Sequence, residues 1–392
     1  MKVTPDADKI RVVDLFAGCG GLTLGIAQAA EASGVKLEVA LAVDFEDAAT
    51  KVYETNFPDA KIFTDSVEAF FDGELGAELS ETEAAVARDY ANITILVGGP
   101  PCQGHSNLNN KTRRKDPKNE LYAKMARAAE VLKPTFVVIE NVPSVRLDTD
   151  QVVQKTAAHL QSLGYIVATA TVKLNALGVA QKRRRHVLLA SSNPAVSAQA
   201  LLDDITRREA DKGHDLRWAI GDLTDLSDRK GYDLKPTPSA DNVKRMNFLL
   251  DHDLYDLPNE HRPVCHQDEH RYTSMYGRLK WTEPAQTITS GFGSIGQGRY
   301  MHPERPRALT AHEAARIQGF PDYFDFSSVT RRSDLATMIG NAVPPALMRE
   351  IAGLLLRAPD DVEPSEDIVD SVSGEQTIAD VPTNEDRELV TV

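Results

Sequence analysis

One cysteine of this chain stands in a short stretch of residues that restrict the backbone. Residues 98–106 read GGPPCQGHS, so Cys102 directly follows two glycines and two prolines. The prolines restrict the turn that presents the thiol, and the glycines allow close approach of another molecule. A site that exposes Cys102 and stabilises its thiolate would make it a nucleophile. A buried structural cysteine is the usual alternative, and we keep it for Cys19 and Cys265.

Three further side chains with reactive or charged groups adjoin predicted strands. Glu140 follows the apolar run TFVVI, so its carboxyl group should stand at the carboxyl edge of a sheet, where open α/β sheets place ligands. Burial there would raise its pKa and suit it to proton donation. Arg183 and Arg185 begin the apolar strand HVLLAS, which would carry them to the same edge. The simpler alternatives are a surface glutamate and a solvated basic face.

A glycine-rich turn near the N-terminus could receive a nucleotide-like cofactor. The stretch VVDLFAGCGG ends a predicted strand, contains Gly18, Gly20 and Gly21, and leads into a predicted helix. Glycine lets the backbone approach a ligand closely, and a helix N-terminus favours negative charge. An ordinary strand-to-helix turn is an equally good interpretation of this stretch alone.

Three aspartates sharpen the cofactor hypothesis. Asp44 ends the next predicted strand, where an acid accepts ribose hydroxyls, and Asp65 is the contribution of the third strand, at the adenine. Asp14 lies just inside the first strand. A pyrophosphate has no use for an acid there, but the cationic amino group of a nucleoside such as S-adenosylmethionine does.

The elements that must position these residues follow an alternating pattern. From residue 10 to 192, short apolar runs rich in β-branched residues alternate with amphipathic stretches. This alternation predicts an α/β fold with a mostly parallel sheet and helices on both faces. Residues 70–92 are acidic with a helical pattern, and we interpret them as a peripheral excursion.

The regular pattern weakens in the middle of the chain and returns later. Residues 194–272 are polar and without a clear period, which predicts a second, smaller domain. We therefore assign residues 1–193 and 273–357 to one catalytic domain, into which the smaller domain is inserted. The acidic tail at 358–392 is too polar to bury a core and is predicted to be disordered.

The net charge of −14 does not exclude an anionic partner. The tail at 358–392 holds eleven acidic residues and one arginine, so it supplies −10 and leaves −4 for the rest. Positive charge gathers at 109–119 and 181–186, and local fields decide whether nucleic acid binds. The tail could mimic DNA, but a solubilising end is the simpler interpretation.

The sequence has no feature of a membrane or secreted protein. No apolar run approaches the ~18 residues that span a bilayer, and the first residues do not form a signal peptide. Three scattered cysteines do not make a disulfide framework. We expect a cytoplasmic protein.

Six motifs together resemble those of the DNA cytosine-5 methyltransferases, in particular the bacterial restriction-modification type. They are DLFAGCGGL, GGPPCQGHS, ENV at 140–142, QKRRR at 181–185, RLKWTEPAQTIT at 278–289 and IGNAVPP at 339–345. Their order and spacing match that family over residues 10 to about 192 and about 273 to 357. The resemblance implies a Rossmann-like methyltransferase sheet that binds S-adenosylmethionine, with the family's target recognition domain at 194–272.

The resemblance also implies a mechanism. Cys102 attacks carbon 6 of a cytosine flipped out of duplex DNA, and Glu140 hydrogen-bonds or protonates ring nitrogen 3. Arg185 contacts the exocyclic oxygen, and Arg183 contacts phosphate or the catalytic loop. The methyl group of S-adenosylmethionine is then transferred to carbon 5.

The binding residues implied by the motifs fall into two sets. Those expected at the cofactor are Asp14, Phe16, Gly18, Gly20, Gly21, Asp44, Asp65, Pro101 and Asn341. Those expected at DNA are Gln103, Ser106, Arg113, Arg114 and Gln181. Because Asn341 would close the cofactor pocket beside Phe16, the last helix should return to the first sheet.

Four positions depart from the usual family pattern: His105 replaces Phe, Asp44 replaces Glu, Ala180 replaces Pro and Lys118 replaces Arg. His105 follows the proposed nucleophile closely, and we expect it to pack rather than to act as a base. We further expect a monomer, whose partner is duplex DNA. A cognate restriction endonuclease would be a functional partner rather than a physical one.

Other interpretations remain open from the sequence. A tRNA substrate would keep the chemistry, and a non-catalytic DNA-binding relative would lose it. The intact Cys102 and Glu140 argue against such a loss. A zinc site formed by His261, Cys265, His266 and His270 is a weaker hypothesis, because the spacing fits no common zinc motif. We therefore predict no metal.

Overall fold

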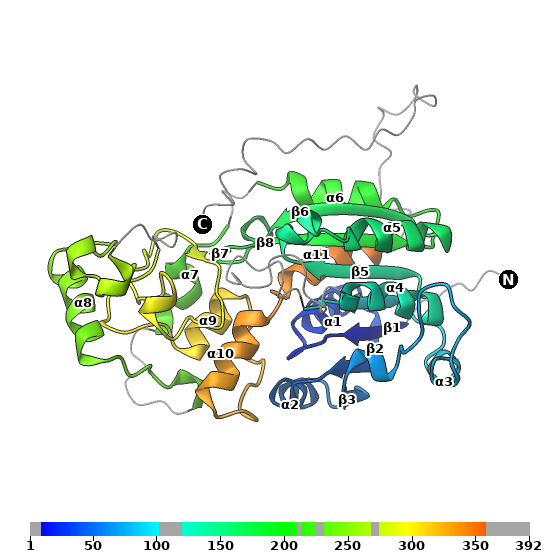
Figure 1. Ribbon diagram of the computed structural model, residues 1–392, viewed down its shortest axis with the longest axis horizontal. Coiled ribbons are helices and arrows are strands. Elements are labelled where there is room, and N and C mark those ends of the chain that lie inside the picture. Colours follow the sequence, from blue (N-terminus) through cyan, green and yellow to red (C-terminus); the bar gives the residue numbers. More distant parts are fainter. Residues whose placement is uncertain (1–8, 102–119, 210–212, 224–230, 268–273, 358–392) are drawn as a thin grey trace, which may run out of the picture.

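A large twisted sheet organises the chain in the computed structural model, which describes residues 9–101, 120–209, 213–223, 231–267 and 274–357 (Figure 1). The sheet has seven strands in the order β3-β2-β1-β4-β5-β8-β6. They are β1 (Lys9–Leu15), β2 (Lys36–Asp44), β3 (Ile62–Thr64), β4 (Ile95–Gly98), β5 (Phe136–Asn141), β6 (Ile166–Lys173) and β8 (Arg184–Ser191). Strands β1 to β5 pair in parallel, whereas β8 runs antiparallel to its neighbours β5 and β6. The predicted α/β fold is confirmed.

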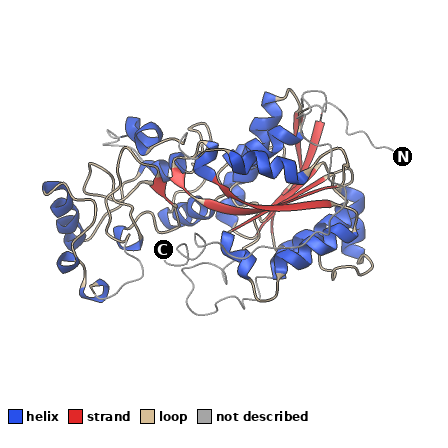
Figure 2. Cartoon of the chain, turned by 90° about the horizontal axis from the view of Figure 1, so that it is seen from above, coloured by secondary structure: helices blue, strands red, loops and turns tan. Residues whose placement is uncertain are grey.

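Helices cover both faces of this sheet (Figure 2). One face packs against α4 (Glu120–Leu132) and α5 (Val152–Ser162). The other packs against α1 (Gly21–Ala32), α6 (Ala198–Arg207) and α11 (Ala346–Leu355). Side chains alternate between the two cores, so Leu96 faces one and its neighbours Ile95 and Val97 face the other. Burial on both faces explains why these strands are continuous apolar runs.

The acidic excursion after β3 is attached to the sheet domain by a buried ion pair. Its helix α3 (Glu81–Asp89) places Glu83 against Arg127 of α4, with Nη2 and Oε2 2.6 Å apart. Both side chains are almost completely buried, so removal of Arg127 would leave the Glu83 carboxylate without its cation. The excursion is therefore a fixed part of the fold.

A smaller body lies beyond the carboxyl edge of the sheet, at the left of Figure 1. It contains α7 (Leu216–Ile220), α8 (Ala240–Asp251), α9 (Ala311–Ile317) and α10 (Arg332–Asn341). A two-stranded parallel pair, β7 (Gln181–Lys182) with β9 (Ala285–Gln286), connects it to the sheet domain. Its core includes Leu216, Phe324 and Ile339 and extends to Leu24 and Val52 of the sheet domain. The two bodies are therefore joined by one shared apolar cluster, beside the two cores of the sheet.

The packing divides the chain differently from the sequence pattern at two places. Helix α6 lies within the predicted small domain at 194–272, yet its Leu202 and Ile205 pack in the core of the large sheet. Helices α9 and α10 follow residue 273 and pack with α7 in the smaller body. The tail at 358–392 lies outside the described residues. Among the described helices, none combines the length and apolar character needed to cross a membrane.

The chain returns to its beginning through α11, which packs along α1. The contact is close at Gly25, where a Cβ atom would lie 2.1 Å from the Pro345 carbonyl oxygen and 2.7 Å from the Arg349 nitrogen. Only glycine fits there without displacing backbone. The expected return of the last helix to the first sheet is therefore present in the structure.

Gly25→Ala is expected to lower the free energy of unfolding by about 1–3 kcal/mol, because its methyl group would overlap backbone atoms of the α11 segment. Gly353→Ala is the matched control. It also adds a methyl group to a helix of this pair but meets no atom within 4 Å, and it should stabilise by up to about 1 kcal/mol. Urea unfolding measures both changes, and equal stability of the two variants would contradict the close α1–α11 contact.

Candidate active site

The carboxyl ends of the parallel strands meet at the edge of the sheet that faces the smaller body (Figure 1). Glu140 stands near the end of β5, and Asp14 near the end of β1. Asp44 ends β2, and Asp65 directly follows β3. Four of the predicted side chains thus gather at one edge, as the strand pattern required.

Glu140 forms a buried ion pair with Arg185 at this edge. The carboxylate oxygen Oε1 contacts Nε of Arg185, and the two side chains are only 7% and 12% exposed. The antiparallel register pairs Asn141 with His186, so Arg185 lies just beyond the end of β5. Burial raises the pKa of Glu140, while Arg185 and then Arg183 oppose that rise. The net effect is a pKa above the ordinary value of a glutamate.

The loop after β4 passes directly beside Glu140. A Cβ atom on Gly99 would lie 3.1 Å from Oε2 of Glu140, so little more than a hydrogen atom fits between them. Asn141 donates from Nδ2 to the Pro100 carbonyl at 3.1 Å and accepts from the backbone N–H of Val142. These contacts fix the course of the loop up to Pro101, immediately before Cys102.

Several predicted residues lie outside the described residues. They are Cys102, Gln103, His105, Ser106, Arg113, Arg114 and Lys118. Their roles remain predictions. The described structure nevertheless places both ends of this segment, at Pro101 and at the start of α4.

The glycine-rich turn is held by the aspartate of the next strand. The backbone N–H of Gly18 donates to Oδ2 of Asp44 at 2.8 Å, and the N–H of Glu46 donates to Oδ1 at 2.9 Å. Gly18 and Gly20 have φ angles of 54° and 93°, which favour glycine. Phe16 is half-buried and shares this left-handed conformation at φ 57°, so the turn is a specific structure rather than a flexible link.

Asp14 is completely buried beneath the turn. Its Oδ2 accepts a hydrogen bond from the Thr23 hydroxyl at 2.7 Å, and that hydroxyl is 2.8 Å from the Tyr53 hydroxyl. Its Oδ1 has no hydrogen-bond partner. Burial, the largest effect, raises the pKa of Asp14 to about 7. An unpaired buried acceptor is costly, and a nearby cationic donor would recover part of that cost.

An exposed aromatic ring beside Asp44 was missed from the sequence. Phe45 directly follows β2 and is 60% exposed, which is unusual for a phenylalanine at the edge of a core. Asp65 is also exposed, and its backbone N–H donates to the Asp44 carbonyl. The signal available in the sequence was an aromatic residue immediately after a strand-ending acid.

Arg183 and Gln181 are buried and form hydrogen bonds within the protein. Arg183 is 2% exposed and donates to the carbonyls of Ile288 at 2.8 Å and Ala342 at 3.1 Å. Gln181 is completely buried, and its amide bonds to Gln318 and to the Ile288 N–H. These side chains alternate with exposed Lys182 and point into the protein. The predicted role of Arg183 at phosphate or the catalytic loop, and that of Gln181 at DNA, stay predictions.

Asn341 stands exposed at the end of α10, two residues before a contact with the glycine-rich turn. The Val343 carbonyl oxygen, two residues later, lies 2.4 Å from where a Cβ of Gly21 would be. The same residue places Cγ2 3.7 Å from where a Cβ of Gly99 would be. The segment after α10 therefore borders both the turn and the loop that leads to Cys102.

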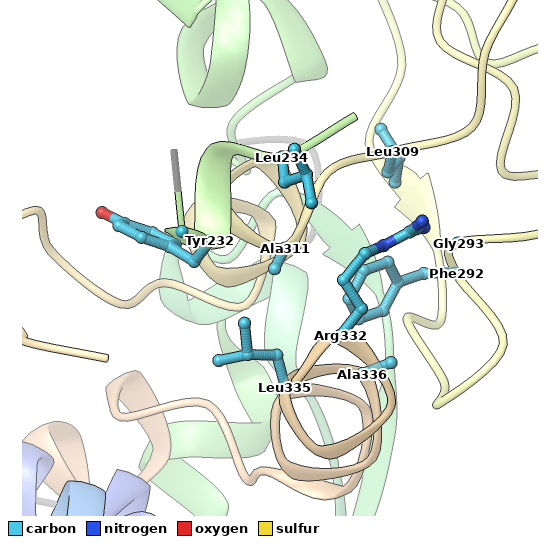
Figure 3. A pocket seen from close by; sticks show the side chains of 10 residues that line it. Tyr232, Leu234, Phe292, Gly293, Leu309, Ala311, Arg332, Leu335 and Ala336 are labelled. Carbon is cyan, nitrogen blue, oxygen red and sulfur yellow. The ribbon is translucent and has the colours of Figure 1, made fainter. Parts of the chain in front are cut away.

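A separate small cavity lies inside the smaller body, away from this edge (Figure 3). Tyr232, Leu234 and Phe292 contribute to its largely apolar wall, and Arg332 of α10 extends across it toward Gly293. This lining holds one arginine and no carboxylate, unlike the paired acid and guanidinium at the sheet edge. We assign the chemistry to the edge.

The zinc site considered from the sequence has no support among the residues described. No group of three His, Cys, Asp or Glu side chains in the described ranges could hold a metal ion. His266 lies 3.0 Å from the Tyr276 hydroxyl through Nδ1, and Cys265 is exposed. His270 lies outside the described ranges.

The glycine-rich turn, the acids at successive strand ends and the antiparallel strand β8 define the class as a methyltransferase-type α/β fold. Two solved structures share it. A putative DNA modification methyltransferase encoded within an E. coli prophage matches with a TM-score of 0.60 and 22% identity, over 88% of this chain and 98% of that one. The S. pombe Dnmt2 methyltransferase matches with a TM-score of 0.58 and 15% identity, over 88% and 97%. Structural similarity at such low sequence identity establishes the fold alone.

The sequence establishes the family. The family model for C-5 cytosine-specific DNA methylases matches residues 10–357. The type II methyltransferase M1.BsuMI of Bacillus subtilis is 41% identical over 341 residues, 87% of this chain and 79% of that protein. The type II methylase M.HgiDII of Herpetosiphon aurantiacus is 30% identical over 88% of this chain and 95% of that protein. The chain belongs to the C-5 cytosine-specific DNA methylase family, which confirms the resemblance of its motifs.

Asp14→Asn is expected to stabilise the protein without cofactor at pH 8. The folded-state pKa of Asp14 is raised from 3.8 to about 7, so its contribution to stability falls as pH rises through that range. Asparagine stays neutral and avoids this loss. Thermal unfolding at pH 5 and pH 8 should show the gain mainly at pH 8. The control Asp65→Asn alters an exposed residue and should leave the unfolding temperature unchanged at both pH values. An equal gain for Asp14→Asn at pH 5 and pH 8 would show that the raised pKa of Asp14 is not its cause.

Proposed function

We propose that this protein transfers the methyl group of S-adenosylmethionine to carbon 5 of cytosine in a specific duplex DNA sequence. The observation that carries the proposal is the buried Glu140–Arg185 pair beside the loop that leads to Cys102. An acid and a guanidinium that converge next to a thiol suit the activation of a pyrimidine ring. Membership of the cytosine-5 methylase family supports the same reaction.

The described residues at the turn fit S-adenosylmethionine. Asp14 keeps a buried acceptor oxygen without a partner, which suits a cationic amino group. The open space beside Gly18 leaves room at the turn, since nothing lies within 4 Å of where its Cβ would be. Asp44 would accept the ribose hydroxyls through remaining lone pairs, and exposed Phe45 offers a ring face for adenine. Bound there, the cofactor would supply an electrophilic methyl group.

The protein side chains would activate the cytosine in three ways. The Cys102 thiolate adds to carbon 6, and the electron pair of the 5,6 double bond becomes available at carbon 5. Glu140 donates a hydrogen bond or a proton to ring nitrogen 3, and Arg185 holds the exocyclic oxygen. After methylation, loss of the proton from carbon 5 expels the thiolate and restores the ring.

The target base must leave the duplex to reach this edge. Base flipping costs a few kcal/mol, and we propose that Gln103, Ser106, Arg113 and Arg114 hold the extruded nucleotide and its phosphates. The smaller body faces the edge and connects to it through β7 and β9. We assign target recognition to this body, with the sheet, α6 and α11 forming the catalytic domain.

We further propose that the protein is the modification enzyme of a restriction-modification system or an orphan methylase, and acts as a monomer. The similarity to two type II methylases supports the first of these roles. A cognate endonuclease would recognise the same DNA sequence without needing to contact this chain.

DNA containing 5-fluorocytosine tests the covalent step. Fluorine cannot leave carbon 5 as a proton does, so the adduct with Cys102 should persist in denaturing gels. Cys102→Ser should abolish both adduct and methylation, whereas Cys265→Ser, which alters an exposed thiol elsewhere, should retain both. Bisulfite sequencing of a plasmid from expressing cells identifies the target site. Methylation of tRNA but not of DNA, in parallel assays, would overturn the proposed substrate.

Glu140→Gln is expected to slow methylation by about 10²–10⁴-fold, because an amide cannot donate an acid proton to ring nitrogen 3. Glu38→Gln is the control, since it alters a partly exposed ion pair near the amino end of β2 and should leave the rate unchanged. Single-turnover assays with saturating cofactor isolate this step. A wild-type rate for Glu140→Gln would exclude Glu140 as the proton donor.

A further inference from the structure

Two buried glutamines connect β7 to the end of α10. Gln181 and Gln318 are both completely buried. The Gln181 Nε2 donates to Oε1 of Gln318 at 2.6 Å, and its Oε1 accepts from the Ile288 N–H at 3.0 Å. Gln318 Nε2 donates in turn to the Ile339 carbonyl at 2.6 Å. Each amide both donates and accepts a hydrogen bond. A carboxylate or an apolar side chain in its place would therefore lose at least one of these hydrogen bonds.

The carbonyl groups at the end of α10 need donors from outside the helix. The last four carbonyls of any α-helix have no partner within it. Gln318 supplies a donor to Ile339 and lies 3.4 Å from the Ala342 carbonyl oxygen. Arg183 donates to Ala342 and lies 3.5 Å from the Gly340 carbonyl oxygen. Side chains from two distant parts of the sequence therefore cap this helix.

The capped helix end has little freedom to move on its other side. A Cβ atom on Gly340 would lie 2.1 Å from the backbone nitrogen of Ser290 and 2.4 Å from the Thr289 carbonyl carbon. Backbone thus packs directly on backbone at this point. The hydrogen bonds of Gln318 and Arg183 therefore fix the position of the helix end against the backbone of Thr289 and Ser290.

The segment that follows forms a wall shared by both halves of the candidate site. Val343 lies against Gly21 at the start of α1 and near Gly99 beside Glu140. Asn341, at the helix end, is exposed. A displacement of the Ile339 and Ala342 carbonyls would therefore move the backbone that borders the cofactor turn.

We propose that Gln318 is a positioning residue for S-adenosylmethionine. By fixing the carbonyls of Ile339 and Ala342, it holds residues 341–343 against the cofactor turn. Gln318 is completely buried and acts through this backbone segment, without contacting cofactor or DNA. The inference rests on the proposed function, because it takes the glycine-rich turn to be the binding site for S-adenosylmethionine.

Gln318→Met tests the role, because it preserves side-chain length and removes both hydrogen-bonding ends. We expect the Kd for S-adenosylmethionine, measured by calorimetry without DNA, to rise about tenfold, as for loss of a buried hydrogen bond. The KM for S-adenosylmethionine should rise in parallel. The kcat at saturating cofactor and the KM for DNA should change much less, which indicates lost cofactor binding rather than lost chemistry.

Leu160→Ala separates positioning from a general loss of stability. Leu160 is a completely buried residue of α5 on the opposite face of the sheet, so this variant should be destabilised and still bind cofactor as the wild type does. Gln181→Met removes the other amide and should weaken cofactor binding in the same direction. The double variant should raise the Kd little beyond either single variant, because the two amides form one connected chain of hydrogen bonds.

The outcomes distinguish this inference from the proposed function. A wild-type protein that binds no S-adenosylmethionine would overturn the proposed function. If the wild type binds and Gln318→Met binds equally well, the positioning role alone is overturned. An equal rise in Kd for Leu160→Ala would also overturn it. If Gln318→Met does not fold, Gln181→Met carries the test, and unchanged binding by that variant would contradict the inference.

Discussion

A carboxylate buried at the end of a strand has to be paired with a cation or remain protonated, and Glu140 meets this requirement through Arg185. The pairing depends on strand direction. Because β8 runs antiparallel to β5, its first residues lie at the carboxyl edge, where Glu140 stands. A parallel strand in the same place would have carried Arg185 to the opposite edge. The reversed direction of β8 therefore brings the acid of Glu140 and the guanidinium of Arg185 together.

The cofactor side depends on segments from both ends of the described chain. The turn after β1 is shaped by Asp44 and bordered by Val343, while α11 packs along α1. The smaller body reaches this region through the β7–β9 pair and through the donors of Arg183 and the buried glutamines. The glycine-rich turn, the loop that leads to Cys102 and the smaller body thus meet along one short stretch of backbone after α10.

Local sequence patterns were sufficient to predict the position of a residue where that position is set by the residue's own strand. Glu140 and Asp44 were predicted at the carboxyl edge because each ends an apolar run, and the edge follows from strand direction alone. The internal contacts of Arg183 and Gln181 could not be predicted, because their partners, such as Ile288 and Ala342, are more than 100 residues away in sequence. A basic run looks the same whether its side chains reach solvent or backbone carbonyls. The packing of α6 on the large sheet could not be predicted for a related reason, since the sequence of an apolar helix face does not show which core it joins.

The packing of α11 on α1 also sets an order of events during synthesis. Ile26 and Ala29 belong to a core completed by Leu347 and Ile351 of α11, which emerge from the ribosome more than 300 residues later. Until then part of the apolar surface of α1 has no native partner, and contacts over such a separation form slowly. The smaller body, by contrast, has almost all of its chain available before α11 is made. The nascent protein therefore completes the region proposed to read DNA before the region proposed to hold the methyl donor.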